Sequence, residues 1–354
     1  MTLKDLGYNE SLQSFREENN LASFQVGRVI LEHKERYIVK SDRQEFDAEL
    51  IGNLRYTADS RYDYPSVGDW VAFSEYDESK ALIHAVYPRF SIIERKAVAK
   101  AGQVQIIATN IDVGLIVQAV DRDFNLNRLE RYLTICNASK VSPVIVLSKK
   151  DLISDDRLQE IKRMIEQRIQ EVPILFISNK EHGVDAIKAF IRHGKTYCLL
   201  GSSGVGKSTL INSLEGKELM ETNEISDSVN KGRHTTSHRE LVVLKGGGIV
   251  IDNPGMREIG ITDTQEGLEI TFEAILEFSK DCKYRDCSHV NEDGCGILAA
   301  LERGEIDEDS YANFRKMERE KQHFESDTLE RKRKDKELGK LIKSVVKKRK
   351  RDKY

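Results

Sequence analysis

The segment GSSGVGKST at residues 201–209 constrains the fold of this chain more than any other feature. It matches the phosphate-binding loop pattern in full: a glycine, four further residues, and then Gly-Lys-Ser. The apolar stretch at 197–200 predicts a buried strand before the loop, and residues 208–214 after it have the apolar spacing of a helix. Strand, glycine-rich turn and helix in this order form the usual frame for binding phosphate. The sequence therefore predicts nucleoside triphosphate binding within an α/β domain.

The residue types of this loop suit a triphosphate bound with magnesium. Glycines let backbone N–H groups turn toward phosphate oxygens, and the helix N-terminus adds the positive end of its dipole. Lys207 supplies a point charge, and the hydroxyl of Ser208 is the expected Mg²⁺ ligand. The predicted nucleotide-binding residues of the loop are Gly201, Ser202, Ser203, Gly204, Val205, Gly206, Lys207, Ser208 and Thr209.

Three further motifs lie at predicted strand ends and indicate which base is bound. The strand expected at 144–147 ends in SKKD, which is similar to the NKxD motif of GTPases, and a strand at 174–177 ends in Ser-Asn. After the phosphate-binding loop, a strand at 249–251 leads into DNPG, a DxxG motif. The carboxyl ends of strands in a doubly wound sheet meet along one crevice, so this rotated order is compatible with a single guanine site. The candidate base-binding residues are Ser148, Lys149, Lys150, Asp151, Ser178 and Asn179.

Together these segments resemble the circularly permuted GTPases and, within them, the RsgA (YjeQ) family of GTPases that depend on the small ribosomal subunit. The resemblance covers nearly the whole chain and includes NID at 110–112, RLERYL at 128–133, GRHTTSHRE at 232–240, DNPGMRE at 252–258 and a cysteine cluster. It implies a GTP hydrolase that binds the small ribosomal subunit and its rRNA. Such an enzyme assists late maturation of the subunit, which in turn stimulates hydrolysis of GTP to GDP and phosphate.

The resemblance also implies roles around the γ-phosphate. Asp252 is expected to hold Mg²⁺ through its water shell, and the backbone N–H of Gly255 to meet the γ-phosphate. An upstream threonine must supply a hydroxyl to Mg²⁺, and Thr236 is favoured over Thr235. These residues would close the nucleotide site from the side opposite the base.

On the base side, Asp151 is expected to accept hydrogen bonds from the guanine N1–H and amine, which excludes adenine. Lys149 would lie along the guanine face, and Ser178-Asn179 would offer a backbone N–H to O6. Ser148 stands where the family has asparagine, and its shorter side chain cannot make the same paired contacts. We therefore expect weaker base binding with an unchanged preference for guanine.

The residue after the DxxG glycine affects hydrolysis. It is Met256, whereas Ras-like enzymes place there a glutamine that orients the attacking water. His234 is the best candidate within the chain to replace that glutamine, because an imidazole can orient water or accept its proton near neutral pH. The alternative is that His234 only structures the switch loop or contacts a phosphate. Without a stimulating partner, slow hydrolysis is expected.

A second chemical site is predicted near the C-terminus, with the pattern Cys282-x4-Cys287-x-His289-x5-Cys295. Three thiolates and one imidazole fill all four positions of a tetrahedral zinc ion and leave none open for catalysis. A structural ion of this kind would help to fold a segment too small and polar to bury its own core. The alternative is unligated cysteines in a reducing cytosol. The other two cysteines lie in apolar surroundings and are expected to be buried: Cys136 and Cys198.

Residues 23–100 form a different kind of segment. Short, partly alternating runs separated by turn-prone stretches indicate a small β-barrel, and five strands would suit an OB-fold. A predicted loop carries Arg55-Tyr56, Arg61-Tyr62 and Tyr64, an interleaving that suits stacked bases and phosphates in RNA. The alternative is an ordinary solvated loop. Trp70, inside a strand pattern, is expected in the core.

The C-terminal end combines a helical pattern at 307–324 with a strongly basic tail. Residues 331–354 hold 13 Lys or Arg against three Asp or Glu, although the whole chain has a net charge of −3. This asymmetry points to a polyanion, and RNA contact is the favoured explanation over a tail that only solubilises. We find no apolar run near the roughly 18 residues that a membrane span needs, so a cytoplasmic monomer without membrane contact is expected.

We therefore predict a multidomain protein that combines α/β and β architecture. It has an N-terminal extension at 1–22, an OB-fold barrel at 23–100, a circularly permuted P-loop GTPase domain at 101–268, and a zinc-binding helical domain with a basic tail at 269–354. Two other classes remain open. One is a P-loop ATPase or kinase with an incidental KKD, and the other is an RNA-binding module whose nucleotide site only switches.

Overall fold

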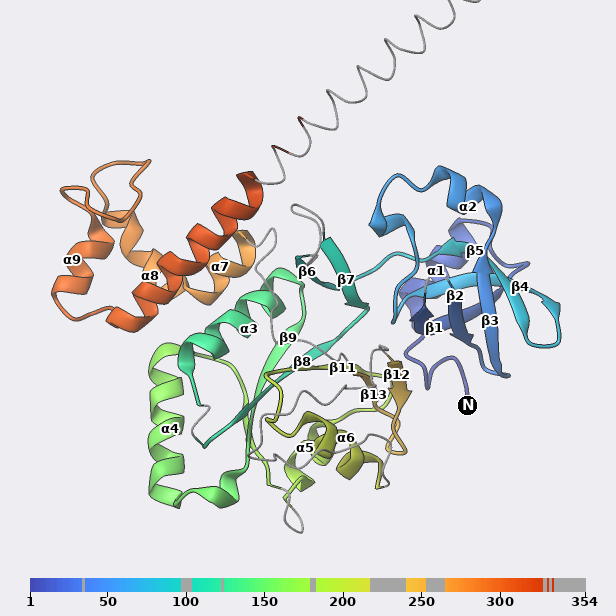
Figure 1. The fold of residues 1–354 in the computed structure, drawn as a ribbon, viewed down its shortest axis with the longest axis horizontal. Coiled ribbons are helices and arrows are strands. Elements are labelled where there is room, and N and C mark those ends of the chain that lie inside the picture. Colours follow the sequence, from blue (N-terminus) through green and yellow to red (C-terminus); the bar gives the residue numbers. More distant parts are fainter. Residues whose placement is uncertain are drawn as a thin grey trace, which may run out of the picture.

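In a computed structural model of the chain, the described residues are 1–33, 36–96, 104–121, 124–178, 183–216, 240–252, 265–326, 330 and 333. They form a β-barrel, an α/β core, and a helical C-terminal module at residues 265–326 (Figure 1). The barrel (blue) and the C-terminal module (orange to red) lie on opposite sides of the view, with the core between and below them.

The barrel is built from five strands: β1 (Gln25–His33), β2 (Arg36–Lys40), β3 (Glu45–Leu50), β4 (Trp70–Asp77) and β5 (Lys80–Val86). Its sheet runs β1-β2-β3-β5-β4, with β3 and β5 parallel and the other neighbours antiparallel, and pairing of β4 with β1 closes it. Alternate side chains of these strands fill the interior, among them Val39, Phe46 and Phe73. The predicted OB-like barrel is confirmed.

Residues before the barrel pack against its outside. Helix α1 (Glu10–Glu18) begins at Asn9, whose side chain accepts a hydrogen bond from the Leu12 N–H. Leu6 and Leu12 join Trp70 in one apolar cluster, and Trp70 is only 1% exposed. The predicted core position of Trp70 is therefore confirmed.

The α/β core is a mostly parallel sheet with the order β10-β9-β8-β11-β13-β12. Its parallel strands are β8 (Val113–Ala119), β9 (Ser142–Ser148), β10 (Ile174–Phe176), β11 (Thr196–Leu200) and β13 (Ile249–Asp252), and β12 (Glu240–Val243) lies antiparallel at the edge. A single Leu31–Glu240 pairing joins β12 to β1 of the barrel. A separate hairpin is formed by β6 (Ile92–Lys96) and β7 (Val104–Thr109). Because the core strands run parallel, their carboxyl ends meet at one edge despite the rotated motif order.

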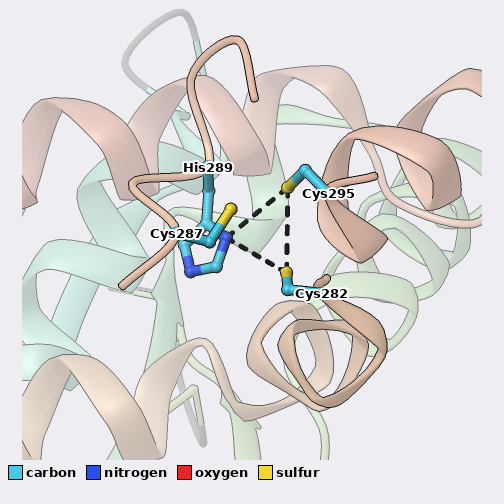
Figure 2. A group of neighbouring side chains, drawn as sticks. All are labelled: Cys282, Cys287, His289 and Cys295. Atoms are coloured by element: carbon cyan, nitrogen blue, oxygen red, sulfur yellow. Dashed lines mark hydrogen bonds between the residues drawn. The ribbon is translucent and has the colours of Figure 1, made fainter. Parts of the chain in front are cut away.

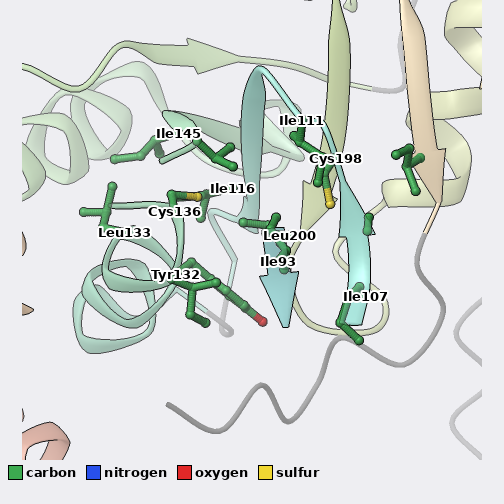
Figure 3. Close-up of a cluster of buried hydrophobic side chains, with 14 of the residues drawn as sticks. Ile93, Ile107, Ile111, Ile116, Tyr132, Leu133, Cys136, Ile145, Cys198 and Leu200 are labelled. Atoms are coloured by element: carbon green, nitrogen blue, oxygen red, sulfur yellow. The ribbon is translucent and has the colours of Figure 1, made fainter. Parts of the chain in front are cut away.

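Helices cover this sheet and bury two apolar clusters. They are α3 (Leu126–Ala138), α4 (Asp155–Arg168), α5 (Asp185–Phe190) and α6 (Lys207–Glu215). The cluster with α3 and α4 contains Leu133, Ile145 and Leu200 together with both predicted buried cysteines (Figure 3). Cys136 and Cys198 are each 0% exposed, as predicted, and burial strongly raises the pKa of Cys136. They act as small apolar side chains.

The C-terminal module consists of short helices and one longer helix. They are α7 (Gln265–Thr271), α8 (Glu273–Leu276), α9 (Gly296–Glu302) and a helix at residues 308–326, close to the predicted 307–324. A small apolar core includes Phe272, Ile297 and Met317. The longer helix lies along α3, where Arg131 forms a two-point ion pair with Glu320 (Figure 1). Across the described ranges, no helix has the length and apolarity needed to span a bilayer.

Candidate functional site

The phosphate-binding loop lies between β11 and α6, as predicted. Where the chain leaves β11, a Cβ on Gly201 would approach the Val117 carbonyl oxygen to 2.3 Å, so only glycine fits beside β8. Gly206, with φ of 97°, precedes α6, and no side chain caps the first turn of that helix. The Lys207 ammonium donates to the carbonyls of Gly201 at 2.7 Å and Ser202 at 2.5 Å. The loop thus has the glycine turn and helix start of a phosphate-binding loop, with the Lys207 ammonium folded against its own carbonyls.

The motif that resembles NKxD is in direct contact with this loop. Ser148, the last residue of β9, is 4% exposed, and its hydroxyl donates to the Val205 carbonyl oxygen at 2.6 Å. Two segments separated by more than fifty residues therefore meet at one sheet edge. The serine at this position links the strand that ends in SKKD to the predicted phosphate loop.

Lys149 begins the short turn η2 (Lys150–Leu152) in a left-handed conformation, with φ of 61°. Its ammonium forms an ion pair with the carboxylate of Asp121, with Nζ and Oδ2 2.8 Å apart. Asp121 follows β8, and sequence reasoning did not identify it. Its one signal in the sequence is an acidic residue shortly after the apolar run at 113–117, which is a common pattern. The ion pair fixes the direction of Lys149 along the sheet edge.

The neighbouring segments complete this side of the site. The N–H of Lys150 donates to the carbonyl oxygen of Ile177, which holds the turn with Asp151 against the end of β10. Ser178 is 4% exposed and its N–H donates to the Gly183 carbonyl oxygen. The strand ends of β9 and β10 are thus fixed side by side.

A further cation approaches the phosphate loop from α3. Asn125 caps that helix by accepting from the Arg128 N–H, and the Arg128 guanidinium donates to the Ser202 hydroxyl at 2.9 Å. Sequence reasoning used residues 128–133 only as part of a family pattern and missed this contact. A link across 74 residues has no local sequence signal.

Part of the predicted site lies outside the described residues: Asn179, His234, Thr235, Thr236, Gly255 and Met256. The backbone of Asp252 ends β13, and Cys198 of β11 pairs with Ile251 in parallel register. The Asp252 backbone therefore reaches the same sheet edge as the phosphate loop. The roles given to these residues stay predictions.

The barrel loop that was a candidate for RNA contact contains α2 (Gly52–Thr57) and the turn η1 (Arg61–Asp63). Tyr56 is 91% exposed. In contrast, Arg61 pairs with Glu32, and the Tyr62 hydroxyl donates to the Glu94 carboxylate. The outward aromatic surface of this loop therefore centres on Tyr56.

The four predicted metal ligands come together in the C-terminal module (Figure 2). Their ligand atoms all lie within 4.8 Å of one another: Cys282, Cys287, His289 and Cys295. Tetrahedral zinc with bonds of about 2.3 Å to sulfur and about 2.0–2.1 Å to nitrogen implies about 3.8 Å between sulfurs and about 3.6 Å between sulfur and nitrogen. The sulfurs of Cys282 and Cys295 are 3.9 Å apart, and they lie 3.6 and 3.5 Å from the His289 Nδ1. The donor set and its spacing both fit zinc.

The surroundings of this cluster favour the ligating forms of Cys282 and His289, whereas burial raises the pKa of Cys287 to about 11. The Gly296 N–H donates to the Cys282 sulfur at 3.3 Å. Burial raises the pKa of Cys282, but this N–H and neighbouring donors outweigh it and lower the pKa overall. Burial also lowers the pKa of His289, which favours the neutral imidazole that binds metal.

Comparisons with known proteins identify the family. The sequence model described as RsgA GTPase matches residues 86–262. A relative from Opitutus terrae named small ribosomal subunit biogenesis GTPase RsgA is 41% identical over 335 residues, which cover 90% of each chain. The chain belongs to the RsgA GTPase family. It is therefore a GTP-hydrolysing enzyme, in agreement with the GSSGVGKST loop between β11 and α6.

Solved structures of RsgA-like proteins support the architecture. The crystal structure of YjeQ from Thermotoga maritima aligns with a TM-score of 0.61 and 26% identity, covering 83% of this chain and 96% of that one. YloQ, described as a circularly permuted GTPase, aligns with a TM-score of 0.59 at 24% identity over 83% of this chain and 93% of its own. The predicted fold class is confirmed: an OB-like barrel, a permuted GTPase core and a C-terminal module with a zinc-like ligand cluster.

Proposed function

We propose that this protein binds the small ribosomal subunit, assists its late maturation, and hydrolyses GTP to GDP and phosphate when the subunit stimulates it. The observation that carries the proposal is the hydrogen bond from Ser148 to Val205, because it joins the base-recognition strand to the phosphate loop in one site. The relative named small ribosomal subunit biogenesis GTPase RsgA supports the biological role.

In the nucleotide site, the N–H groups of the loop at 201–209 and the Lys207 ammonium bind the phosphates. Mg²⁺ is held by the hydroxyls of Ser208 and Thr236, with Asp252 acting through its water shell. Asp151 accepts from the guanine N1–H and amine, while Lys149, oriented by its ion pair, lies along the base. Mg²⁺ supplies charge compensation at the β- and γ-phosphates.

For hydrolysis we propose that His234 orients the attacking water, in place of the glutamine used by Ras-like enzymes. Its substitution by alanine should lower the rate stimulated by the subunit while GDP affinity stays close to wild type. An equal loss of rate and affinity would instead assign His234 a structural role in the switch.

We also propose one structural Zn²⁺ in the C-terminal module, held by Cys282, Cys287, His289 and Cys295. The distances between their ligand atoms support this ion, and the four ligands leave no position for substrate. Zinc would therefore act by stabilising the short loops that join α8 to α9.

The proposed RNA contacts are the exposed Tyr56 on the barrel and the basic tail, which lies beyond the described residues. An aromatic ring with high exposure offers a stacking surface for a base, and a lysine-rich tail offers phosphate contacts. We propose that the protein acts as a cytoplasmic monomer that meets rRNA through these two surfaces.

Single-turnover GTP cleavage, measured with and without purified small subunits, tests this function. The subunit should raise the rate, and Lys207→Ala should abolish nucleotide binding in both conditions. An unchanged rate would overturn the stimulated reaction, while negligible multiple turnover would favour an RNA-binding module that only switches. Competition by ATP as strong as that by GTP would favour the ATPase or kinase alternative.

A further inference from the structure

A groove of about 410 Å³ lies between α3 and the helix at 308–326. Its lining includes three cations, Arg128 and Arg131 from α3 and Lys316 from the facing helix. Amide and phenol groups from Asn125, Asn127 and Tyr132 also line it. The described part of its lining contains no carboxylate, in a chain whose net charge is −3. The groove therefore offers hydrogen-bond donors and the charge of Lys316 beside two arginines, of which Arg131 is neutralised by Glu320.

The electrostatic surroundings strengthen this character. The groove includes the cap of α3, and among the described residues the first turn of this helix holds no carboxylate to oppose the positive end of its dipole. Arg131 is held in place by its ion pair with Glu320. Lys316 is exposed, and among the described residues it has no ion-pair partner. One cation is thus available to a ligand, and the two guanidiniums beside it are positioned by other contacts.

These groups match the chemistry of a phosphate oxyanion. Lys316 offers a point charge and Arg128 adds a guanidinium beside it, whereas both terminal nitrogens of Arg131 already donate to Glu320. The Arg128 guanidinium also donates to Ser202, so the groove adjoins the phosphate loop without being part of it. A ligand here would be distinct from the phosphates of GTP.

We propose that this groove, which we name the α3 groove, binds a second phosphate group. The phosphate can come from an RNA backbone or from a small phosphate solute, because both present the same oxygens. The inference goes beyond the nucleotide site and does not depend on GTP hydrolysis. The bound phosphate would contact both α3 of the core and the helix at 308–326 of the C-terminal module.

The test uses the full chain saturated with GDP and Mg²⁺, so that the phosphate loop is filled before any probe is added. One probe is a fluorescein-labelled single-stranded oligoribonucleotide, followed by anisotropy between 50 and 200 mM salt, a range of about fourfold. The other is inorganic phosphate, followed by calorimetry. The variant is Lys316→Ala, and the matched control is Arg319→Ala, which removes an exposed cation from the same helix outside the groove.

If RNA is the source, Lys316→Ala weakens oligoribonucleotide binding and reduces the salt slope by about 0.7, the value for one lost contact to a single strand. If a small solute is the source, Lys316→Ala removes the heat of phosphate binding and leaves the oligoribonucleotide unaffected. The control keeps wild-type behaviour in both cases. Equal losses in Lys316→Ala and Arg319→Ala, or no loss with either probe, would overturn the proposal. GDP affinity, measured first, separates this outcome from failure of the nucleotide site.

Discussion

A buried carboxylate, Glu130, is one of the contacts between the core and the C-terminal module, and its removal gives a testable prediction. Glu130 on α3 is 1% exposed. It accepts from Arg168 at 3.0 and 2.8 Å, from the Asn313 amide at 2.6 Å and from the Ser310 hydroxyl at 2.9 Å. Two of these partners belong to the helix at 308–326. The carboxylate therefore joins α3, α4 and the C-terminal module in one hydrogen-bonded group.

Replacing Glu130 by alanine removes the main partner of Arg168, whose side chain is only 9% exposed, and leaves it the longer ion pair with Asp307 at 3.4 Å and a hydrogen bond to Asn127. Breaking a buried ion pair in this way costs about 3–5 kcal/mol. Each 1.4 kcal/mol is a factor of ten, so the loss corresponds to roughly two to three and a half orders of magnitude in an equilibrium constant. We expect this loss to appear mainly as easier opening of the helix at 308–326, because Ser310 and Asn313 lose their acceptor.

Native-state hydrogen exchange measures this opening directly. Glu130→Ala should lower the protection of amides in residues 308–326, while the barrel strands keep theirs. The control is Glu320→Ala, which removes the partly exposed ion pair with Arg131 and should cost about 0–1 kcal/mol. Equal effects of the two substitutions, or a loss under about 1 kcal/mol for Glu130→Ala, would refute this reasoning. Either result would mean that the buried Glu130 carboxylate stabilises the helix at 308–326 no more than the partly exposed Glu320 does.

Substitutions at three further positions test the two sites. Ser148→Ala leaves the Val205 carbonyl unpaired at a cost of about 1–3 kcal/mol, so GDP affinity measured by calorimetry should fall about tenfold. Ser148→Thr keeps the hydroxyl and should bind better than the alanine variant, and the reverse order would count against the contact. Asp121→Asn removes the partly exposed ion pair with Lys149 and should weaken GDP binding about two- to fivefold, whereas an unchanged dissociation constant would assign the pair no role. Cys295→Ser should reduce the bound zinc measured by atomic absorption from one ion per chain and lower the thermal stability of the C-terminal module, and unchanged zinc content would exclude the proposed ligand set.

The local sequence pattern was sufficient to predict the strand and the helix on either side of the phosphate-binding loop. The apolar run before Gly201 and the helical spacing after Lys207 gave β11 and α6, because strand, turn and helix signals are short-range. The cluster at 282–295 was predictable for the same reason, since all four ligands lie within one short segment. The barrel was predictable from short alternating runs separated by turns.

Contacts between distant segments were not predictable. Glu130 looked like an ordinary charge on α3, and only the fold brings Asn313 to it from 183 residues away. The same holds for Asp121 and Arg128, whose partners lie on other strands and loops. From the sequence, Ser148 was only a shorter replacement for asparagine with weaker base contacts. The structure shows that its hydroxyl donates a hydrogen bond to the Val205 carbonyl oxygen. Which distant residues pair depends on their distances in the folded chain, and a single sequence does not give those distances.

The substitution Asp151→Asn tests whether motifs in rotated order form one guanine-specific pocket. Competition binding should be measured with GDP, ADP and xanthosine diphosphate on the wild-type chain and on the variant. Loss of two charge-assisted hydrogen bonds should weaken GDP binding by at least about 100-fold. The new amide should favour xanthosine diphosphate, because it can donate to the oxygen that replaces the guanine amine. Unchanged preferences among the three nucleotides would contradict the account, because they would mean that the SKKD segment does not contact the base.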